Sequence, residues 1–393
     1  MGRILMDIAD HCRGQGHGLK SADPGVLDVF AHQFFSGFLI AVQKRVEDLD
    51  MLVIAVLKAV GKPRAQHHKT HIVVQNQVHH RTDIGISHKL NQIGVKYIFH
   101  GTNPFATYPR VWGHEFAGEV VRVGEQVMDL SQGDHVVGEP FVSCKTCYAC
   151  RHGRGNVCEN LQVYGVHLDG GCQEYLVIKR EKVHQVPKDM SWSLAALAEP
   201  LTIGFQSVSR GRVEKGDLVL IMGAGPIGLT VLMAVKAAGG TAIITDLYDD
   251  KLEYARRFGA DVTVNVRNKE LCSYIEELEE RPNVIFDCVC TKTSLEEAVD
   301  MVSAAGRVVE LGFGDIKSEI SHATLMKKEV DVCGTRLQTG KFPEAIRYIK
   351  EHQDLLEGFV TQQFPVERLK EAFDFVGRNP GLVRKAQILL NQD

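Results

Sequence analysis

Four of the ten cysteines lie close together in loop-like sequence: Cys144, Cys147, Cys150 and Cys158. Four thiolates at this spacing can surround one Zn²⁺ tetrahedrally with no open position, which defines a structural metal site. Two alternatives stay open: a chance cluster of buried cysteines, and a redox pair, although a redox pair needs only two thiols. Because no export signal precedes the cluster, we expect a reducing, cytoplasmic compartment, where clustered cysteines bind metal rather than form disulfides.

A glycine-rich turn follows an apolar run and precedes a helix-like segment; it reads Gly223-Ala224-Gly225-Pro226-Ile227-Gly228. Gly223 permits a tight turn, Gly225 lets the backbone approach a pyrophosphate, and Gly228 allows close packing of helix on strand. The helix N-terminus then presents unpaired N–H groups to the phosphates. Asp246 ends the next apolar run, where a carboxylate accepts hydrogen bonds from the adenosine ribose and repels a 2′-phosphate. No arginine stands at 247 or 248. This pattern predicts NAD rather than NADP, and the alternative is a glycine turn without a ligand.

His114 and Glu115 precede a β-rich run, and Glu199 lies in the sequence AEPL. One imidazole and two carboxylates can serve as ligands of a second zinc ion that keeps an open coordination position. Residue types alone do not establish such a site, because an isolated His–Glu pair is more often an ordinary surface or core pair. The three residues form a site only if the fold brings them together.

The composition describes an ordinary globular chain. Its 393 residues suit about two domains, and 44% hydrophobic with 24% charged residues exclude wholesale disorder. A formal net charge of −4 argues against a protein that binds nucleic acid by neutralising phosphates. The apolar stretch 218–235 is long enough to be considered as a membrane span, but its glycines and Pro226 divide it into strand, turn and helix. We therefore expect neither nucleic acid nor membrane as a partner.

After about residue 190 the apolar pattern predicts alternating strands and helices. We expect strands at 218–222, 242–246, 263–266, 284–289 and 307–311, and helices at 227–238, 249–258, 268–280, 294–304 and 342–351. Repeated β–α units predict an α/β fold with a doubly wound parallel sheet of the Rossmann type. Between 98 and 190, short runs such as FAGEVVRVG, HVVGEP and EYLVI predict a β-rich domain.

Residues 1–95 differ from the rest of the chain. Nine of the 17 histidines lie in residues 1–90, and the segment lacks the clear alternation of strands. The run 51–60 predicts a helix that Gly61 and Pro63 end. The stretch RAQHHKTHIVVQNQVHHRTD suggests metal binding, but histidine-rich composition is a weak indication of a site.

Several segments, in one order, resemble the zinc-dependent medium-chain alcohol/polyol dehydrogenase family: YPRVWGHEFAGEVVRVG, the cysteine loop, YGVHLDGG, AEPLTIG and GAGPIGL. The branch resembled includes sorbitol, threonine and sugar-acid dehydrogenases, and the resemblance covers roughly residues 98–393. It implies a GroES-like catalytic domain split around a Rossmann domain. The domains expected are an atypical segment 1–95, a GroES-like domain 96–190 with the structural-zinc loop, a Rossmann domain 191–335, and a C-terminal return 336–393 to the catalytic domain.

The resemblance also implies roles for single residues. His114 matches the catalytic-zinc histidine, Glu115 the acidic residue beside it, and Glu199 the acidic ligand of the polyol branch. Arg336 resembles a position near the cofactor phosphates. The segment Leu311-Gly312-Phe313 would help to position the nicotinamide. The cofactors implied are NAD, a structural Zn²⁺ and a second, catalytic Zn²⁺, in a homo-oligomer that is a dimer or tetramer.

One segment departs from the family pattern. Upstream of IFHG the family reads approximately G-[IV]-C-G-[ST]-D-x-H, with the Cys a catalytic-zinc ligand and the Ser/Thr a proton relay. Here the stretch is NQIGVKYIFHG; an ungapped alignment puts Asn91 or Gln92 at the Cys, and Ile93 or Gly94 at the Ser/Thr. A frameshift, a wrongly assigned start or a replaced N-terminus would explain this departure, and a new N-terminal module is the alternative. The upstream nucleotide sequence, read in all frames, would distinguish them.

The function expected is the zinc-dependent, NAD-linked oxidation of a secondary alcohol, which is a polyol, a sugar acid or a threonine-like substrate. Without the thiolate we expect weak catalytic zinc and slow turnover, unless Cys12 or His88 is a substitute ligand. The first alternative is a non-catalytic, NAD-binding and zinc-stabilised protein. The second is a zinc-lobe scaffold for partner proteins, which would not bind NAD. The sequence does not identify the alcohol.

Overall fold

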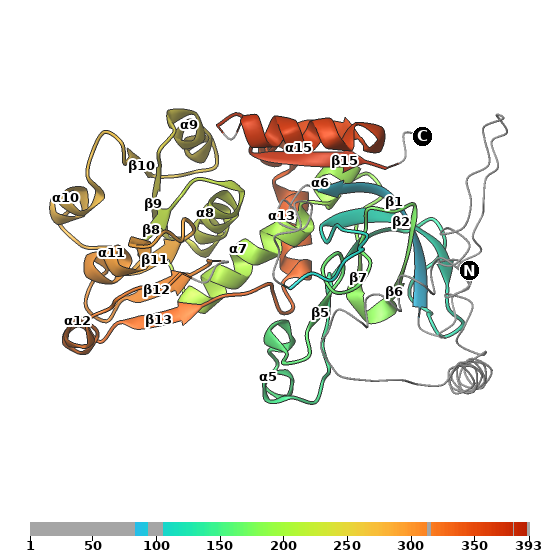
Figure 1. The fold of residues 1–393 in the computed structure, drawn as a ribbon, viewed down its shortest axis with the longest axis horizontal. Coiled ribbons are helices and arrows are strands. Elements are labelled where there is room, and N and C mark those ends of the chain that lie inside the picture. The colour runs from blue at the N-terminus through green and yellow to red at the C-terminus, as the bar shows by residue number, and fades with distance from the viewer. Residues whose placement is uncertain (1–82, 93–104, 313–315, 380, 391–393) are drawn as a thin grey trace, which may run out of the picture. The chain divides into compact units, whose positions relative to one another are not determined.

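A six-stranded parallel sheet forms the middle of the chain (Figure 1). The computed structural model describes residues 83–92, 105–312, 316–379 and 381–390, and for 83–92 it describes the backbone only. The strand order is β10-β9-β8-β11-β12-β13, and every neighbouring pair is parallel. The strands are β8 (Leu218–Met222), β9 (Thr241–Asp246), β10 (Val262–Asn265), β11 (Val284–Asp287), β12 (Arg307–Glu310) and β13 (Asp331–Gly334). This is the doubly wound Rossmann order, as the sequence predicts.

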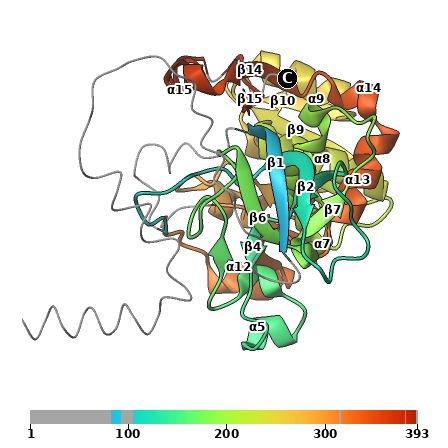
Figure 2. The ribbon, with the colours of Figure 1, turned by 90° about the vertical axis from the view of Figure 1, so that its right-hand side faces the viewer.

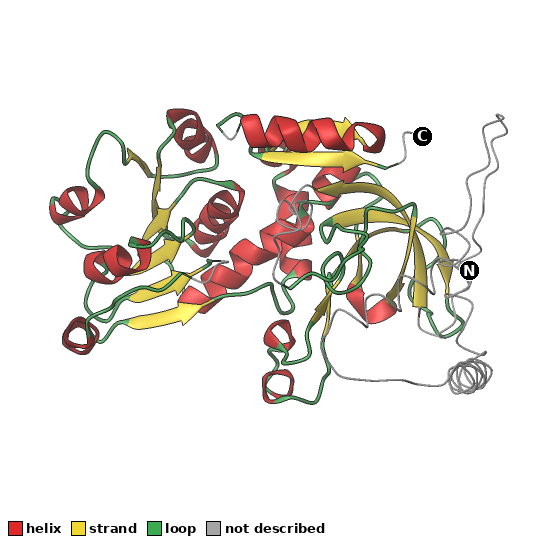
Figure 3. Cartoon of the chain, in the orientation of Figure 1, coloured by secondary structure: helices red, strands yellow, loops and turns green. Residues whose placement is uncertain are grey.

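Helices cover both faces of this sheet, which is why its strands are nearly continuous apolar runs (Figure 3). Along β8, Val219 and Ile221 join one hydrophobic cluster and Leu220 and Met222 join another. The first cluster includes side chains of α7 (Ala198–Gly211), α8 (Pro226–Ala238), α9 (Asp249–Arg257) and α13 (Phe342–Glu351). The second includes α10 (Leu271–Glu276), α11 (Ser294–Met301) and α12 (His322–Lys328).

A second, seven-stranded sheet contains strands from both ends of the described chain. Its order is β14-β15-β1-β2-β3-β7, and β6 also pairs with β1 (Figure 2). The strands are β1 (Asp83–Gln92), β2 (Phe116–Val123), β3 (His135–Gly138), β6 (Tyr175–Lys179), β7 (Val183–Gln185), β14 (Val360–Pro365) and β15 (Lys385–Leu389). The residues after the Rossmann sheet therefore return to the sheet that the earlier residues begin.

The remaining elements are short, except for one helix. They are β4 (Phe141–Val142), β5 (Gln162–Val163), α5 (Tyr148–Arg151), η2 (Gly155–Val157), η3 (Arg180–Lys182), α6 (Trp192–Ala195), α14 (Gln353–Leu356), η4 (Val366–Arg368) and α15 (Leu369–Arg378). Strand β4 pairs with β5 beside the cysteine loop. Among the described residues, no helix is long and apolar enough to cross a membrane, and the stretch 218–235 divides into β8, a turn and α8.

Strand β1 lies within the N-terminal segment that the sequence analysis separates from the rest. Ile84, Ile86 and Leu90 alternate with polar residues along it, and it pairs with β2, β6 and β15. This strand was not predicted, because the polar residues around it hid a short alternation. The predicted helix 51–60, the histidine-rich stretch, Cys12, Ile93, Gly94 and Phe313 lie outside the described residues.

Candidate metal and cofactor sites

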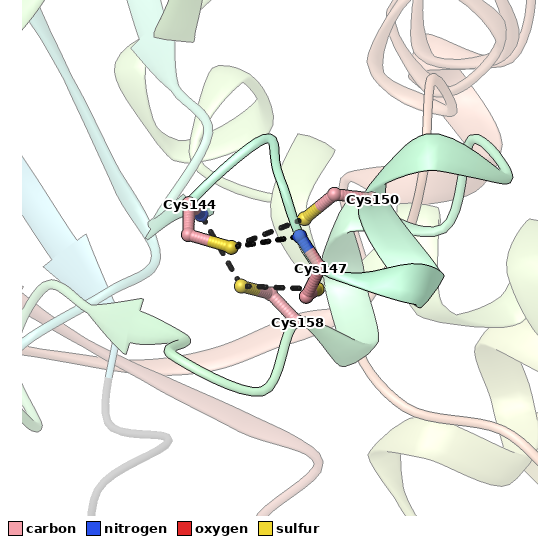
Figure 4. A group of neighbouring side chains, drawn as sticks. All are labelled: Cys144, Cys147, Cys150 and Cys158. Atoms are coloured by element: carbon pink, nitrogen blue, oxygen red, sulfur yellow. Dashed lines mark hydrogen bonds between the residues drawn. The ribbon is translucent and has the colours of Figure 1, made fainter.

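The four clustered cysteines converge on one point (Figure 4). Their sulfur atoms all lie within 4.8 Å of one another. The Sγ atoms of Cys144 and Cys150 are 3.9 Å apart, and those of Cys147 and Cys158 are also 3.9 Å apart. A tetrahedral Zn²⁺ with bonds of about 2.3 Å would set its sulfur atoms ~3.8 Å apart. The separations fit one zinc ion and are too long for a disulfide bond.

The backbone of the loop supports thiolates. The N–H groups of Cys147 and Asn160 donate to the sulfurs of Cys144 and Cys158 at 3.3 Å each. The Thr146 hydroxyl and nearby N–H groups lower the pKa of Cys144 to about 5, while burial raises the pKa of Cys150 to about 11. In the metal-free loop, Cys144 therefore carries a negative charge more readily than Cys150. A bound dication would favour the thiolate form of all four ligands.

His114, Glu115 and Glu199 form a second group, with one ligand atom of each within 4.8 Å of the others. His114 and Glu115 lie just before β2, and Glu199 lies in the first turn of α7. Both glutamates are buried, each with 5% of its surface exposed. The fold therefore brings together the three candidates that residue types alone left uncertain.

Two glycines of the YGVHLDGG segment hold the stretch of backbone that leads into His114. The N–H groups of Gly170 and Gly171 donate to the carbonyls of Val111 and Gly113 at 2.7 and 2.8 Å. A Cβ on Gly170 would lie 2.1 Å from the Gly113 carbonyl oxygen, so a larger residue would push the two segments apart. This backbone-to-backbone packing positions His114.

The electrostatics of this group fit a cation. Burial, with the Glu115 carboxylate in second place, raises the pKa of Glu199 well above its usual value. Burial also lowers the pKa of His114, which favours the neutral imidazole that a metal needs. His114 Nδ1 is buried without a hydrogen-bond partner among the described residues. Lys385, at the start of β15, pairs with Glu115 and supplies one positive charge against two carboxylates. A divalent ion would offset the remaining charge.

The backbone register of β1 ends beside this group. Asn91 is the partner of Phe116 in β2, so Gln92 and Glu115 are the next residues in the same antiparallel register. Gln92 is also the partner of Gln387 in β15, two residues beyond Lys385. Of the two positions that the sequence alignment offered for the family's cysteine, residue 92 is therefore opposite a candidate ligand.

The glycine-rich turn leaves open space beside its backbone. Gly223 has a φ of +98°, and a Cβ on Gly228 would lie 1.9 Å from the Gly223 carbonyl oxygen, so the turn requires glycine at both positions. At Gly225 a Cβ would meet nothing within 4 Å. The helix α8 begins at Pro226 and Ile227 without a side-chain cap, so its first N–H groups face this open space. The turn fits a bound pyrophosphate.

Asp246 lies at the end of β9, beside the turn. Its Oδ2 accepts from the Ala224 N–H at 3.0 Å, and its Oδ1 accepts from the N–H groups of Leu247 and Tyr248 at 2.8 and 3.1 Å. These hydrogen bonds hold the carboxylate next to the glycine turn. This is the position at which the sequence predicts a carboxylate that hydrogen-bonds to the adenosine ribose. Lys251 Nζ lies 3.7 Å from Oδ2.

The other cofactor candidates are placed less directly. The Leu311 N–H donates to the carbonyl of Asp287 at 3.1 Å, and the Gly312 N–H donates to the Glu310 carboxylate at 2.7 Å. Both therefore follow β12 at the carboxyl edge of the sheet. The Arg336 guanidinium lies 5.8 Å from the Phe105 ring centre. The backbone carbonyl of Arg336 accepts a hydrogen bond from the side-chain amide of Asn156, in the cysteine loop. A role for Arg336 at the cofactor phosphates stays a prediction.

Two lysines at these sites were not predicted from sequence. Lys385 begins an apolar strand, and only the pairing of β15 with β1 brings it to Glu115. Lys251 stands five residues after Asp246 in the charged helix α9, where a lysine usually faces solvent. Its spacing of about one helical turn from the end of β9 was the available signal.

Comparisons with known proteins agree with this architecture. The family model described as an alcohol dehydrogenase GroES-like domain matches residues 86–188, and the one described as a zinc-binding dehydrogenase matches residues 226–351. The first match begins within β1, earlier than the resemblance seen in the sequence.

Individual relatives extend over most of the described chain. The starvation-sensing protein RspB of Escherichia coli K12 is 37% identical, covering 70% of this chain and 82% of its own. The L-galactonate-5-dehydrogenase of the same organism is 31% identical, covering 70% and 81%. The solved structure of the alcohol dehydrogenase rspB from Escherichia coli CFT073, complexed with NADH, has a TM-score of 0.74 at 33% identity, and the match covers 79% of this chain and 92% of that one. The chain belongs to the zinc-type medium-chain alcohol and polyol dehydrogenase family.

Proposed function

We propose that the chain is a zinc-dependent dehydrogenase that oxidises a secondary alcohol of a polyol or sugar acid with NAD⁺. The observation that carries this proposal is the convergence of His114, Glu115 and Glu199 in a chain of this family. The L-galactonate-5-dehydrogenase relative supports a sugar acid as one substrate class. A threonine-like substrate belongs to the same proposal through the family resemblance.

The position of each residue suggests its role in binding the metal or the cofactor. His114 and Glu199 would hold the catalytic metal, with Glu115 as a further ligand or as the group that orients them. A zinc ion held there would lower the pKa of the substrate hydroxyl, and a bound NAD⁺ would serve as the hydride acceptor. Lys385 holds Glu115 in place through their ion pair. Gly225 and the start of α8 would bind the pyrophosphate, and Asp246 the adenosine ribose, while Leu311, Gly312 and Phe313 would line the nicotinamide side.

An activity screen tests the proposal. The full chain, supplied with Zn²⁺ and NAD⁺, is assayed against polyols, polyol phosphates, sugar acids and threonine by the absorbance of the reduced cofactor. We expect turnover of at least one of these and its loss on treatment with a chelator. NADH binding without turnover of any substrate would favour the non-catalytic alternative, and failure to bind NADH would favour the scaffold.

We also propose that the four clustered cysteines hold a structural zinc. Replacing Cys147 by serine is expected to remove about one tightly held Zn per chain and to lower the Tm, because folding and metal binding are coupled in such loops. Metal analysis and thermal unfolding measure both effects. Cys272→Ser, a cysteine of α10 outside the cluster, is the matched control and should keep its full zinc content. Full zinc content in the Cys147→Ser chain would contradict the assignment.

Cofactor choice and assembly complete the proposal. Asp246 favours NAD over NADP because a 2′-phosphate would lie beside its fixed carboxylate. A homo-oligomer, dimer or tetramer, and a cytoplasmic location stay predictions. Size-exclusion chromatography with light scattering would measure the first.

A further inference from the structure

A third group of acidic and thiol side chains lies at the carboxyl edge of the Rossmann sheet, separate from the two candidate metal sites. One oxygen or sulfur atom of each of Asp287, Cys290 and Glu310 lies within 4.8 Å of the others. Asp287 ends β11 and Glu310 ends β12, and the two are register partners in neighbouring parallel strands (Figure 1). Ligands of a Rossmann sheet bind outside this edge, so the group lies on the side where the cofactor is expected.

Asp287 is fully buried and accepts three hydrogen bonds. Its Oδ1 accepts from the N–H groups of Val289 and Cys290 at 3.0 and 2.9 Å, and its Oδ2 accepts from the Ser294 hydroxyl. Donors that surround a carboxylate stabilise its charged form. The Asp287 side chain therefore places a negative charge beside Glu310.

The Glu310 carboxyl group holds the backbone that follows β12. Its Oε1 accepts from the Gly312 N–H at 2.7 Å. A Cβ on Gly312 would lie 2.4 Å from that oxygen and 2.9 Å from the Cys290 sulfur, so Gly312 packs directly on the group. The Leu311 N–H donates to the carbonyl of Asp287 at 3.1 Å. Leu311 and Gly312, which would line the nicotinamide side, therefore depend on Asp287 and Glu310 for their position.

The surroundings of Glu310 supply a negative charge but no paired cation. The titratable groups that the elements packed against β12 carry near this edge are Asp287, Cys288, Cys290 and Lys292 of β11 and the loop after it, Cys333 and Arg336 of β13 and the residues after it, Arg210 of α7, and Glu296 and Glu297 of α11. Arg210 donates its Nε–H to the carbonyl of Gly334, the register partner of Glu310. In the described part of the chain, no ion pair joins a cation to Asp287 or to Glu310.

Two carboxyl groups this close carry two charges only at a cost, and one of them tends to keep its proton. Burial, with the Asp287 carboxylate adding to it, raises the pKa of Glu310 above its usual value, although the Cys290 thiol acts in the opposite direction. Glu310 therefore keeps its proton to a higher pH than an ordinary glutamate does.

We propose that Glu310, in its protonated form, is a positioning residue for the nicotinamide end of the cofactor. The inference rests on the proposed NAD-linked function. The neutral carboxyl group lies beside Asp287 without repulsion, and its carbonyl oxygen holds the Gly312 N–H in the conformation that receives the cofactor. Once Glu310 loses its proton, the two carboxylates repel each other, and the half-buried Glu310 side chain turns toward solvent and releases Gly312. Cofactor affinity is therefore highest at low pH and falls as the pH rises and Glu310 ionises.

Dissociation constants of NADH, measured by cofactor fluorescence on the full chain from about pH 5 to about pH 9, test the proposal without any turnover. In the unaltered chain the constant is expected to rise about fivefold with pH and then to level off, since one backbone hydrogen bond contributes on that scale. Glu310→Gln keeps a carbonyl oxygen for the Gly312 N–H and cannot ionise, so it should keep the low-pH affinity at every pH. Glu310→Ala has no acceptor and should bind NADH about fivefold more weakly than Glu310→Gln at every pH.

Two further variants separate this role from a general effect of pH. Asp287→Asn keeps an Oδ1 acceptor but removes the neighbouring charge, so the rise in the dissociation constant should move to lower pH. Glu296→Gln is the matched control: the Glu296 carboxylate also accepts from a backbone N–H, that of Glu319 at 2.6 Å, and its loss should leave the pH profile unchanged.

The outcomes distinguish this role from the proposed function. A Glu310→Gln chain that keeps the rise with pH, or an Asp287→Asn chain whose rise stays at the same pH, would overturn the positioning role and leave the proposed function intact. An unaltered chain that binds no NADH at any pH would overturn both.

Discussion

The His114→Ala chain is expected to lose at least about three orders of magnitude in kcat/KM for alcohol oxidation, and to hold one zinc fewer than the unaltered chain. A Lewis-acid metal lowers the barrier by several kcal/mol, and about 1.4 kcal/mol corresponds to a factor of ten. Alanine removes the imidazole that lies with Glu115 and Glu199 among the described residues. Steady-state kinetics with added Zn²⁺ and metal analysis measure the two effects.

NADH affinity distinguishes this result from a general loss of structure. The carboxylate of Asp246 accepts from the N–H groups of Ala224, Leu247 and Tyr248, and His114 is not among its hydrogen-bond partners in the described part of the chain. The dissociation constant of NADH should therefore stay unchanged. His322→Ala, an exposed histidine at the start of α12, is the matched control and should keep full activity. Unchanged zinc content and turnover in His114→Ala would place the catalytic metal elsewhere.

The Rossmann half of the fold could be predicted from sequence because its signals are local. A strand buried on both faces must be an apolar run, so 218–222 and 242–246 agree closely with β8 and β9. The helix predicted at 268–280 is shorter in the structure, Leu271–Glu276; it begins later than predicted because the Glu270 side chain caps it by accepting from the Ser273 N–H. The helix α7 was not predicted; most of its residues are buried, so it shows little of the polar face that indicates a helix.

The group of His114, Glu115 and Glu199, the proposed catalytic metal site, could not be predicted from any local pattern. Its parts come from the residues before β2, from the first turn of α7, and from the start of β15. The pairing of β15 with β1 and of β1 with β2 brings Lys385 to Glu115, which is far from it in the sequence. The cysteine loop could be recognised from sequence because all four candidate ligands lie in one short segment.

The charge of the proposed catalytic metal site indicates what the absence of a thiolate would change. Glu115 and Glu199 provide two carboxylates, and Lys385 neutralises one of them through its ion pair. A zinc ion held by His114 and these carboxylates lacks the soft, charged sulfur that zinc binds well. No cysteine stands between residues 83 and 104. The group can therefore bind zinc, but we expect it to do so more weakly than a site with a thiolate.

The register of β1 decides where a thiolate would help. Successive residues of a strand belong to opposite faces, so positions 91 and 92 are not equivalent. Asn91 is the partner of Phe116, while Gln92 is next in register with Glu115 and is the partner of Gln387. Of these two positions, only residue 92 is therefore in register with the candidate ligand Glu115 on one side, and on the other it is the partner of a residue two positions beyond Lys385.

Replacing Gln92 by cysteine is expected to tighten binding of the catalytic zinc by at least about 100-fold, since even the partners that orient ligands contribute ~10–100-fold. Turnover should rise with zinc occupancy, although the absent Ser/Thr relay limits the gain. Asn91→Cys adds the same thiol to the other face of the strand and is the matched control; it should leave zinc affinity and turnover unchanged. Zinc affinity is measured by competition with a chromophoric chelator on chains whose cysteine loop is intact and already loaded with zinc, and the His114→Ala chain gives the baseline without the second site. Equal gains from both cysteines, or none from Gln92→Cys, would show that the register of β1 does not bring residue 92 to the metal.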